Sequence, residues 1–345
     1  MKKFFRLLFI GLLTLTSCSD GRDEPVPEEN TTLLMAVNAI PGFQEEAIYD
    51  LQGNKIYECD KGDRIHSLVA EGRNWYALLQ RPDSVYYVVK NGKYVRDCAG
   101  IVFGFALNKG SLYTMINLYD HIWCYKDFFT TCFDLDIDGG VLYNTFSVHD
   151  GNIAMGINGE NPSYWYNGLY IPVKGLDEGF RRIYGIDIDI NTYDELITFE
   201  SYQSGKNMYW WKWKKNELPS GFVPTMSRIV NGHAFILGEQ TDRQGVGSLV
   251  HGVPAVLIDG IETILSDEGI DCKAVSVVSQ GMNSFILTQH TGGPYSCVYK
   301  NMMPLRLPDI HTPYHMGPYG SSDGQDGKSN ISMLGIKAIA VLEKK

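Results

Sequence analysis

One unit of about 41 residues recurs along most of the chain, and it limits the folds that the chain can adopt. Gly53 and Asn301 stand at equivalent places in the first and last copies, six intervals apart. Each copy reads as an apolar strand, a turn, a second strand, a polar loop, a third strand of alternating aromatics, a tight turn and a short fourth strand. Such units bury their apolar faces against neighbouring copies, so they predict a repeat architecture.

The hairpin between the third and fourth strands gives the clearest signal. Asn91-Gly92, Asn167-Gly168 and Asp259-Gly260 stand between alternating apolar runs. A type I′ turn needs positive φ at both central positions, which these pairs tolerate. The predicted hairpins cover residues 47–57, 85–95, 122–129, 164–171, 208–218, 255–261 and 296–302.

Four strands in a unit of 40–45 residues resemble the blades of β-propeller families over residues 31–345. The repeated motifs of WD40 and kelch propellers are missing, so no subfamily is indicated. Six full units run from 65 to 308, and residues 33–60 lack a first strand that residues 331–343 can supply. Sharing one sheet between the two ends would close the ring and remove exposed edges. We predict an all-β β-propeller of about seven four-stranded blades, with six blades as second choice and a β-sandwich as the alternative.

The N-terminus has the form of an export signal. Residues 1–17 carry Lys2, Lys3 and Arg6 before an apolar run that is shorter than the about 20 residues of a membrane span. The run ends in Leu15-Thr16-Ser17-Cys18, which resembles the lipobox of bacterial lipoproteins. The resemblance implies that Cys18 is lipidated and begins the mature chain. An ordinary secretory signal is the alternative.

Residues 18–30 are acidic and contain two prolines, so we expect a solvated tether ahead of a propeller domain at 31–345. Ser19 stands where inner-membrane lipoproteins have aspartate, and the acidic stretch resembles the surface-export signal of Bacteroidetes lipoproteins. The resemblance implies a lipid anchor in the bacterial outer membrane and exposure at the cell surface, with the periplasmic face as the alternative.

The charge balance bears on partners. The formal net charge is −10, and removing the leader takes away three positive charges and no negative ones. Because phosphate backbones repel an acidic chain, the balance argues against a nucleic-acid partner.

Six cysteines remain besides Cys18, and an exported chain could join them in 15 ways. None forms a C-x-x-C pair, so zinc and thioredoxin-type chemistry have no support. Several lie in apolar strands, as in Trp123-Cys124-Tyr125, where a buried free thiol is the alternative to a disulfide.

Asp134, Asp136 and Asp138 precede Gly139 in the D-x-D-x-D-G pattern that begins a calcium loop. The glutamate expected at position twelve is absent, because Thr145 stands there. The same segment can therefore be interpreted either as a calcium site or as a strand whose carboxylates face water. Asp187 and Asp189 alternate in the same way without the glycine, which favours the strand for both segments.

Dense aromatic runs offer a second candidate site. Trp165, Trp210, Trp211 and Trp213 lie in strand-like runs, where alternate residues face opposite sides. Exposed rings could stack on sugars, and packing between blades is the alternative. Residues 310–329 break the strand pattern and include His311 and His315, a weaker metal candidate that also reads as a plain surface loop.

No G-x-S-x-G, H-E-x-x-H, P-loop or G-x-G-x-x-G occurs, so no catalytic residue can be named. Our first hypothesis is a membrane-anchored binding or scaffold module for a glycan or a protein partner. The alternative is a polysaccharide-active hydrolase or lyase on a propeller scaffold, because fold alone does not decide function. A subunit of an envelope complex is the third reading. Calcium is the one cofactor that the sequence proposes.

Overall fold

The computed structural model describes residues 31–39, 45–118, 121–136, 143–158, 162–170, 179–189, 192–241, 252–265, 272–290, 296–305, 307 and 335–343. They belong to one compact unit, Thr31–Lys345. Regular structure in the described residues consists of 28 strands. No helix among these residues is long and apolar enough to cross a membrane.

The strands form seven four-stranded antiparallel sheets, which we number as blades 1 to 7 in chain order. Blade 1 contains β28 (Ile336–Glu343), β1 (Thr31–Val37), β2 (Ala47–Asp50) and β3 (Lys55–Glu58). Blade 2 contains β4 (Arg64–Glu71), β5 (Asn74–Gln80), β6 (Tyr86–Lys90) and β7 (Lys93–Cys98). Blade 3 contains β8 (Ile101–Asn108), β9 (Ser111–Leu118), β10 (His121–Lys126) and β11 (Thr130–Asp136).

The remaining four sheets follow the same order. Blade 4 contains β12 (Tyr143–His149), β13 (Asn152–Asn158), β14 (Ser163–Tyr166) and β15 (Leu169–Tyr170). Blade 5 contains β16 (Phe180–Asp189), β17 (Asp194–Ser201), β18 (Asn207–Trp211) and β19 (Lys214–Glu217). Blade 6 contains β20 (Phe222–Val230), β21 (His233–Gln240), β22 (Val253–Ile258) and β23 (Ile261–Ile264). Blade 7 contains β24 (Cys272–Gln280), β25 (Asn283–His290), β26 (Ser296–Lys300) and β27 (Met303–Pro304).

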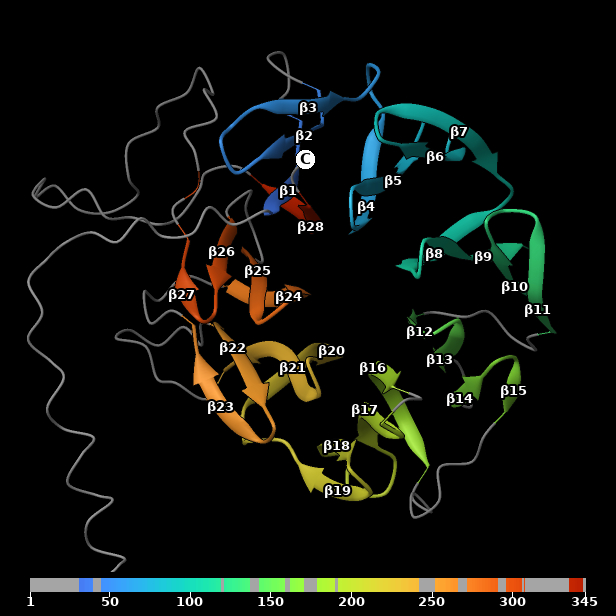
Figure 1. Ribbon diagram of the computed structural model, residues 1–345. Helices are drawn as coiled ribbons and strands as arrows, with labels where there is room; N and C mark the ends of the chain where they lie inside the picture. Colours follow the sequence, from blue (N-terminus) through green and yellow to red (C-terminus); the bar gives the residue numbers. More distant parts are fainter. Residues whose placement is uncertain are drawn as a thin grey trace, which may run out of the picture. The chain divides into compact units, whose positions relative to one another are not determined.

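The seven blades stand in chain order around a central axis, which confirms the first-choice prediction of a seven-bladed β-propeller (Figure 1). The inner strands are β28, β4, β8, β12, β16, β20 and β24. The two ends of the domain share blade 1, because β28 pairs with β1 from Thr31↔Glu343 to Val37↔Ile336. The C-terminal strand therefore supplies the first strand that the N-terminal repeat lacks.

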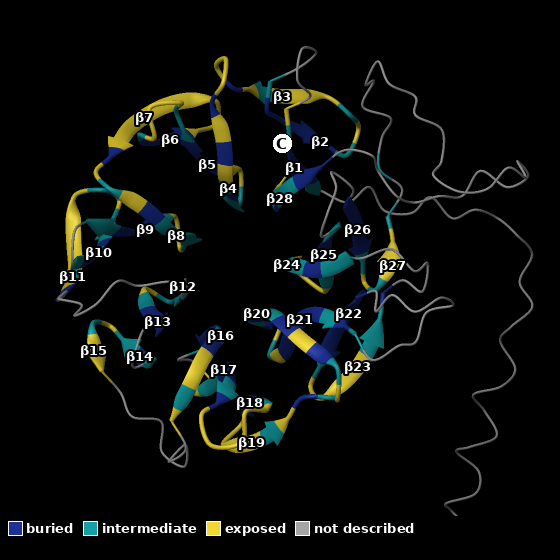
Figure 2. Ribbon diagram, turned by 180° about the vertical axis from the view of Figure 1, so that it is seen from behind, coloured by how far each residue is buried: buried dark blue, intermediate teal, exposed yellow. Residues whose placement is uncertain are grey.

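Apolar side chains fill the spaces between successive blades. The middle strands are the most buried, as in β13, where six of seven residues are buried, and the outer strands are largely exposed (Figure 2). One cluster joins Met115 and Cys124 of blade 3 to Phe146 and Met155 of blade 4. Each blade is thus stabilised by burial against two neighbours rather than by a single central core.

The predicted tight turns close the outer hairpins. Asn91-Gly92, Asn167-Gly168 and Asp259-Gly260 have positive φ at both positions, as a type I′ turn requires. Blade 5 places Lys212 and Trp213 in the same turn, with φ of 49° and 63°. This backbone is costly for residues with a Cβ, so the turn is set by the surrounding strands rather than by its own sequence.

Inner strands of six blades carry a bulge near their first residues. The register with the second strand skips a residue in each, namely Lys337, His66, Phe103, Tyr184, Thr225 and Val275, and in β16 it skips Arg181 as well. A bulge bends the strand and redirects a side chain. These six residues therefore occupy equivalent positions close to one end of the inner strands.

Candidate functional site

The two ends of the blades differ in how they connect strands. We call one end the turn face; it holds the connections between strands three and four of every blade and between strands one and two of blades 2 to 7, which are two to four residues long, and the two ends of the domain in blade 1. We call the other end the loop face; it joins strands two and three and successive blades. Its longest connections span residues 241–252 and 305–335. Long connections carry binding residues more often than tight turns do, so the loop face is the candidate ligand surface.

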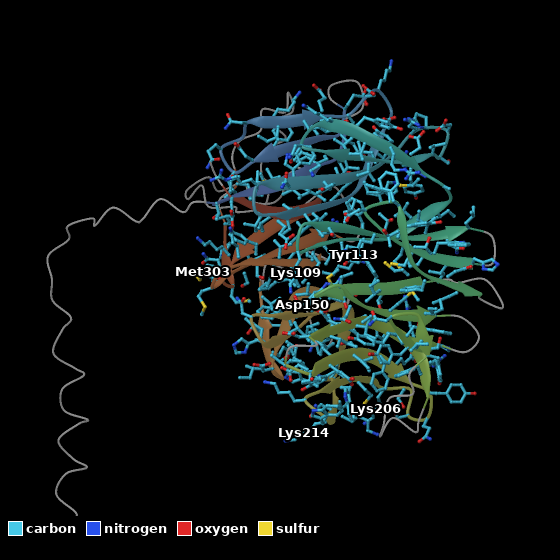
Figure 3. The ribbon with its side chains drawn as sticks, turned by 45° about the vertical axis from the view of Figure 1, so that its right-hand side comes forward. Lys109, Tyr113, Asp150, Lys206, Lys214 and Met303 are labelled. Atoms are coloured by element: carbon cyan, nitrogen blue, oxygen red, sulfur yellow. The ribbon has the colours of Figure 1, made fainter. Side chains whose placement is uncertain are left out.

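The turn face is held together by polar contacts between neighbouring blades. The Glu71 carboxylate of blade 2 accepts hydrogen bonds from the backbone N–H groups of Lys109 (2.9 Å) and Gly110 of blade 3. The ammonium group of Lys109 meets the Asp150 carboxylate of blade 4 at 2.6 Å, and the two labelled residues lie close together in Figure 3. The Asn108 side chain also accepts the Gly151 N–H, at 3.0 Å.

The next two junctions are occupied by His149, Asp187 and Arg228, from the inner strands of blades 4, 5 and 6. His149 Nε2 lies 2.8 Å from Asp187 Oδ1, and Asp187 Oδ2 accepts the Ile229 N–H at 2.7 Å. Arg228 donates to the Phe146 carbonyl of blade 4 at 3.0 Å, reaching past blade 5. The three side chains therefore form one network along the inner strands.

The charges in this network stabilise one another. Asp187 is fully buried, and burial alone would raise its pKa. Hydrogen bonding and charge from His149, with the positive charge of Arg228, outweigh burial and lower the pKa of Asp187. For His149 the balance is the mirror image: burial lowers its pKa, but Asp187 reverses that effect and raises it. Because every partner is a backbone group or a member of the network, its geometry is that of an inter-blade link.

At the loop face, a charged cluster links blades 1 and 2. Glu46 is buried, pairs with the Lys337 ammonium group and accepts the Ile65 N–H at 2.5 Å. Beside it, Tyr87 donates its hydroxyl to the buried Asp63 carboxylate at 2.5 Å. Burial, followed by this hydrogen bond, raises the pKa of Tyr87 well above its usual range. These contacts fix the chain where the first blade meets the second.

An aromatic row runs along β10 from its first residue at the loop face towards the turn face. Trp123 and Tyr125 stack with their ring centres 6.2 Å apart and their planes 13° apart, and His121 lies 6.2 Å from Trp123. All three are partly exposed. His121 Nδ1 lies 3.0 Å from the exposed Asp134 carboxylate of β11. The row therefore combines flat apolar surface with a polar pair, which is the composition of many small-molecule sites.

The structure separates the four tryptophans that the sequence singled out. Trp210 and Trp211 are each 7% exposed and pack on opposite sides of blade 5. Trp165 is partly buried and donates its indole N–H to Ser163 Oγ at 2.8 Å. Trp213 is 65% exposed because it occupies the left-handed turn at the turn face. Three of the four thus pack against clusters between blades, Trp165 only partly buried, and Trp213 alone of the four is mostly exposed to solvent.

The calcium candidate is only partly described. Asp134 and Asp136 lie in β11, which agrees with the strand that the alternation favoured. Asp134 pairs with His121, whereas the Asp136 side chain and all of Asp138 lie outside the described residues. Cys18, His311 and His315 lie outside them as well. Among the side chains that the structure describes, no three His, Cys, Asp or Glu gather as metal ligands.

The sequence signals missed the networks that depend on contacts between blades. His149 and Asp187 are 38 residues apart, and Glu46 and Lys337 are 291 apart. The alternation of Asp187 and Asp189 predicted the strand that contains them, but it did not indicate that Asp187 pairs with His149. Aligning the repeats would place His149 and Asp187 near the ends of successive first strands, which is the one sequence signal for their meeting.

The blades, their order and the shared first sheet define the class: the domain is a seven-bladed β-propeller. No protein-family model matches the chain, and no curated protein matches its sequence. Among solved structures, the β-propeller domain of the Trilobed protease from Pyrococcus furiosus is similar, with a TM-score of 0.51 and 8% identity, over 79% of this chain and 89% of that one. That propeller is described as having an open velcro topology.

Two other solved chains align with lower scores. The computationally designed Ika8 protein has a TM-score of 0.47 at 13% identity, over 81% of this chain and 88% of its own. Apo AztD from Citrobacter koseri has a TM-score of 0.46 at 9% identity, over 82% and 83%. At these identities the likeness concerns the fold alone.

Proposed function

We propose that this chain is a binding module of the bacterial envelope, anchored through lipidated Cys18 in the outer membrane at the cell surface, whose propeller captures a glycan on its loop face. The lipobox-like segment Leu15-Thr16-Ser17-Cys18 and the acidic residues after it support the anchor. One acyl chain holds a protein only marginally, and several hold it stably, so multiple acylation of Cys18 suits a permanent tether.

The observation that carries the proposal is the difference between the two faces. At the turn face, short connections and polar contacts between blades use the side chains for assembly. At the loop face, longer connections extend from the same rigid strands. A rigid scaffold with variable connections on one side is the arrangement that binding surfaces on repeat folds use.

The aromatic row on β10 favours a glycan as the ligand. The rings of Trp123 and Tyr125 offer flat apolar area, and the Asp134 carboxylate beside His121 can accept hydrogen bonds from hydroxyl groups. Sugar rings present both an apolar face and a rim of hydroxyls, so they match this combination.

The test is a thermal-shift screen of the chain from Ser19 onward against oligosaccharides, with and without calcium. A ligand that binds the native state raises the melting temperature according to RT ln(1 + [L]/Kd). We expect one glycan class to raise the melting temperature of the wild-type protein. This shift should be lost in Trp123→Ala and in His121→Ala, the smaller of the two truncations. It should be kept in Trp213→Ala, because Trp213 lies at the turn face.

Other outcomes would overturn the proposal in different ways. Loss of the shift in Trp213→Ala alone would move the ligand to the turn face. No shift with any glycan would favour a protein partner, and product formation from a bound polysaccharide would favour the enzyme alternative. The anchor has its own test, because Cys18→Ser should release the chain from the membrane fraction. Unchanged processing under an inhibitor of the lipoprotein signal peptidase would exclude the anchor.

A further inference from the structure

Two cysteines lie on the two strands of the outer hairpin of blade 3. Cys124 lies in β10 and Cys132 in β11, and the pairing passes from Cys124↔Phe133 to Tyr125↔Thr131, so Cys132 is the extra residue of a bulge. Opposed residues of antiparallel strands have Cα atoms about 4.5–5.5 Å apart, inside the range of about 4.4–6.8 Å that disulfides use. The bulge places Cys132 next to Phe133, the residue that opposes Cys124, and the Cys132 thiol lies 4.0 Å from the Thr130 carbonyl oxygen.

The two thiols have opposite environments. Cys124 is fully buried in the cluster between blades 3 and 4, whereas Cys132 is exposed on the outer strand. Interaction with the Cys124 thiol, helped by the charge of Lys126, lowers the pKa of Cys132 to about 7. The same interaction, with burial, raises the pKa of Cys124 far above its usual range. An accessible thiol with thiolate character next to a buried one is the arrangement of an attacking and a resolving cysteine.

We propose that Cys124 and Cys132 are a thiol–disulfide exchange site that closes into an intra-hairpin disulfide by reaction with an accessible disulfide oxidant, such as oxidised glutathione or a protein disulfide. The Cys132 thiolate attacks one sulfur of the oxidant, and the other sulfur leaves as a thiolate. Cys124 then loses its proton and attacks Cys132 Sγ, which releases the second thiolate. The protein loses two protons and two electrons, and the oxidant becomes two thiols.

The bond would act on the outer edge of the blade. Strand β11 pairs only with β10 within its sheet, and the short loop between them, residues 127–129, already brings the cysteines together. Closing a short loop removes less unfolded-state entropy than closing a long one. The main effect should therefore be local: the oxidised hairpin resists opening from the edge of blade 3.

The test equilibrates the full-length protein in glutathione buffers of increasing oxidised fraction, blocks remaining thiols with an alkylating agent and maps peptides by mass spectrometry. Lys126 lies between the two cysteines, so cleavage after it leaves peptides that only the disulfide joins. We expect a linked Cys124–Cys132 pair in wild type and in the control Cys98→Ser. In Cys124→Ser, Cys132 should accumulate as the glutathione mixed disulfide, and in Cys132→Ser the linked peptide should be lost completely.

Two results would overturn the proposal. The first is a wild-type protein in which Cys132 stops at the mixed disulfide under every buffer, since Cys124 would then not reach it. The second is linkage of either cysteine to another partner in place of the pair. Circular dichroism of each variant checks that folding is kept, and the Cys98→Ser control shows that loss of a buried thiol alone does not remove the link.

Discussion

At the residue scale, one small device recurs in five blades. A turn residue with a short polar side chain accepts the backbone N–H of the second residue of strand two, at 2.8–2.9 Å. The five acceptors are Asn91, Asp127, Asn167, Asp259 and Asn301. The same turn residue donates its own N–H back to the carbonyl of that partner. The preference for Asn and Asp in these turns therefore has two causes, the left-handed backbone and the clamp between the two hairpins.

The clamp predicts the effect of Asn91→Ala. This change removes the acceptor for the Trp75 N–H and the donor to Asn74, and leaves a methyl side chain at a φ of 48°. We expect a loss of about 1–3 kcal/mol in the free energy of unfolding. Urea denaturation followed by far-ultraviolet circular dichroism measures it, and a loss below experimental error would show that the clamp does not stabilise the blade.

In blade 5 the opposite effect on stability is expected from Trp213→Gly, which replaces a residue strained in a left-handed turn by glycine. The tryptophan is 65% exposed at a φ of 63°, so little packing is lost and the strained backbone is relieved. Glycine adds freedom to the unfolded chain, which offsets part of the gain. We expect a net stabilisation of roughly 0.5–1 kcal/mol. Destabilisation would mean that the Trp213 ring makes a contact worth more than its turn strain.

His149 gives the fold a predictable pH dependence. Its pKa is raised in the folded state, so its stabilising contribution is complete below the unfolded value of about 6.5 and is lost as pH rises through the folded value. Asp187 has a lowered pKa, so its contribution is present above its unfolded value and is lost in acid. At a pH between the lowered pKa of Asp187 and the raised pKa of His149, both side chains of the pair are charged.

The matched variant is His149→Gln, which keeps an amide donor near Asp187 without a titrating ring. Between pH 6 and pH 8.5 we expect wild type to lose stability relative to His149→Gln, measured by urea unfolding at each pH. Parallel pH profiles for the two proteins would contradict the raised pKa.

At the element scale, the blades could be predicted from sequence and the networks could not. Turns such as Asn167-Gly168 are decided by adjacent residues, so they are readable from the chain. The seventh blade required only that β28 supply a missing strand. The pairing of Lys337 with Glu46, by contrast, depends on that closure and on a bulge in β28. Neither the closure contact nor the bulge is predicted by a local pattern of residues. The burial of Trp210 and Trp211 was likewise undecided, because both faces of a blade are buried.

The role of β28 can be tested by ending the chain at Gly335. The missing strand would expose the inner edge of β1 and remove Ile336 and Ile339 from the cluster that joins blades 1 and 7. We expect loss of the single cooperative unfolding transition in calorimetry, because an open edge also invites intermolecular pairing. A chain ending at Glu343 is the control. A truncated protein with the wild-type transition would show that the ring does not need this strand.

At the scale of the whole molecule, the turn face links six successive blade junctions. The series of contacts begins where the Glu343 N–H donates to the Gly72 carbonyl. It continues through the carboxylates of Glu71, Asp150 and Asp187. It ends where the Asn231 side-chain amide donates to the Gly281 carbonyl at 2.8 Å. Each of these contacts joins neighbouring blades, and the contact of Arg228 with the Phe146 carbonyl is an exception that reaches past a blade. Stability should therefore be close to a sum of junction contributions, as in repeat proteins whose units interact with adjacent copies. The closed ring adds the one feature that open repeats lack, which is that every blade has two neighbours.

Additivity across the ring is the last prediction. Glu71→Ala should cost roughly 1–2 kcal/mol, because two backbone N–H groups lose a charged acceptor, and Asn231→Gly roughly 0.5–1.5 kcal/mol without strain at its left-handed position. Glu71→Gln, which keeps one acceptor, is the milder control. The two sites lie at separate junctions with no shared partner, so the double variant should equal the sum within about 0.5 kcal/mol. A larger deviation in urea unfolding would show that the two junctions are energetically coupled through the closed ring. The seven blades would then not be stabilised independently of one another.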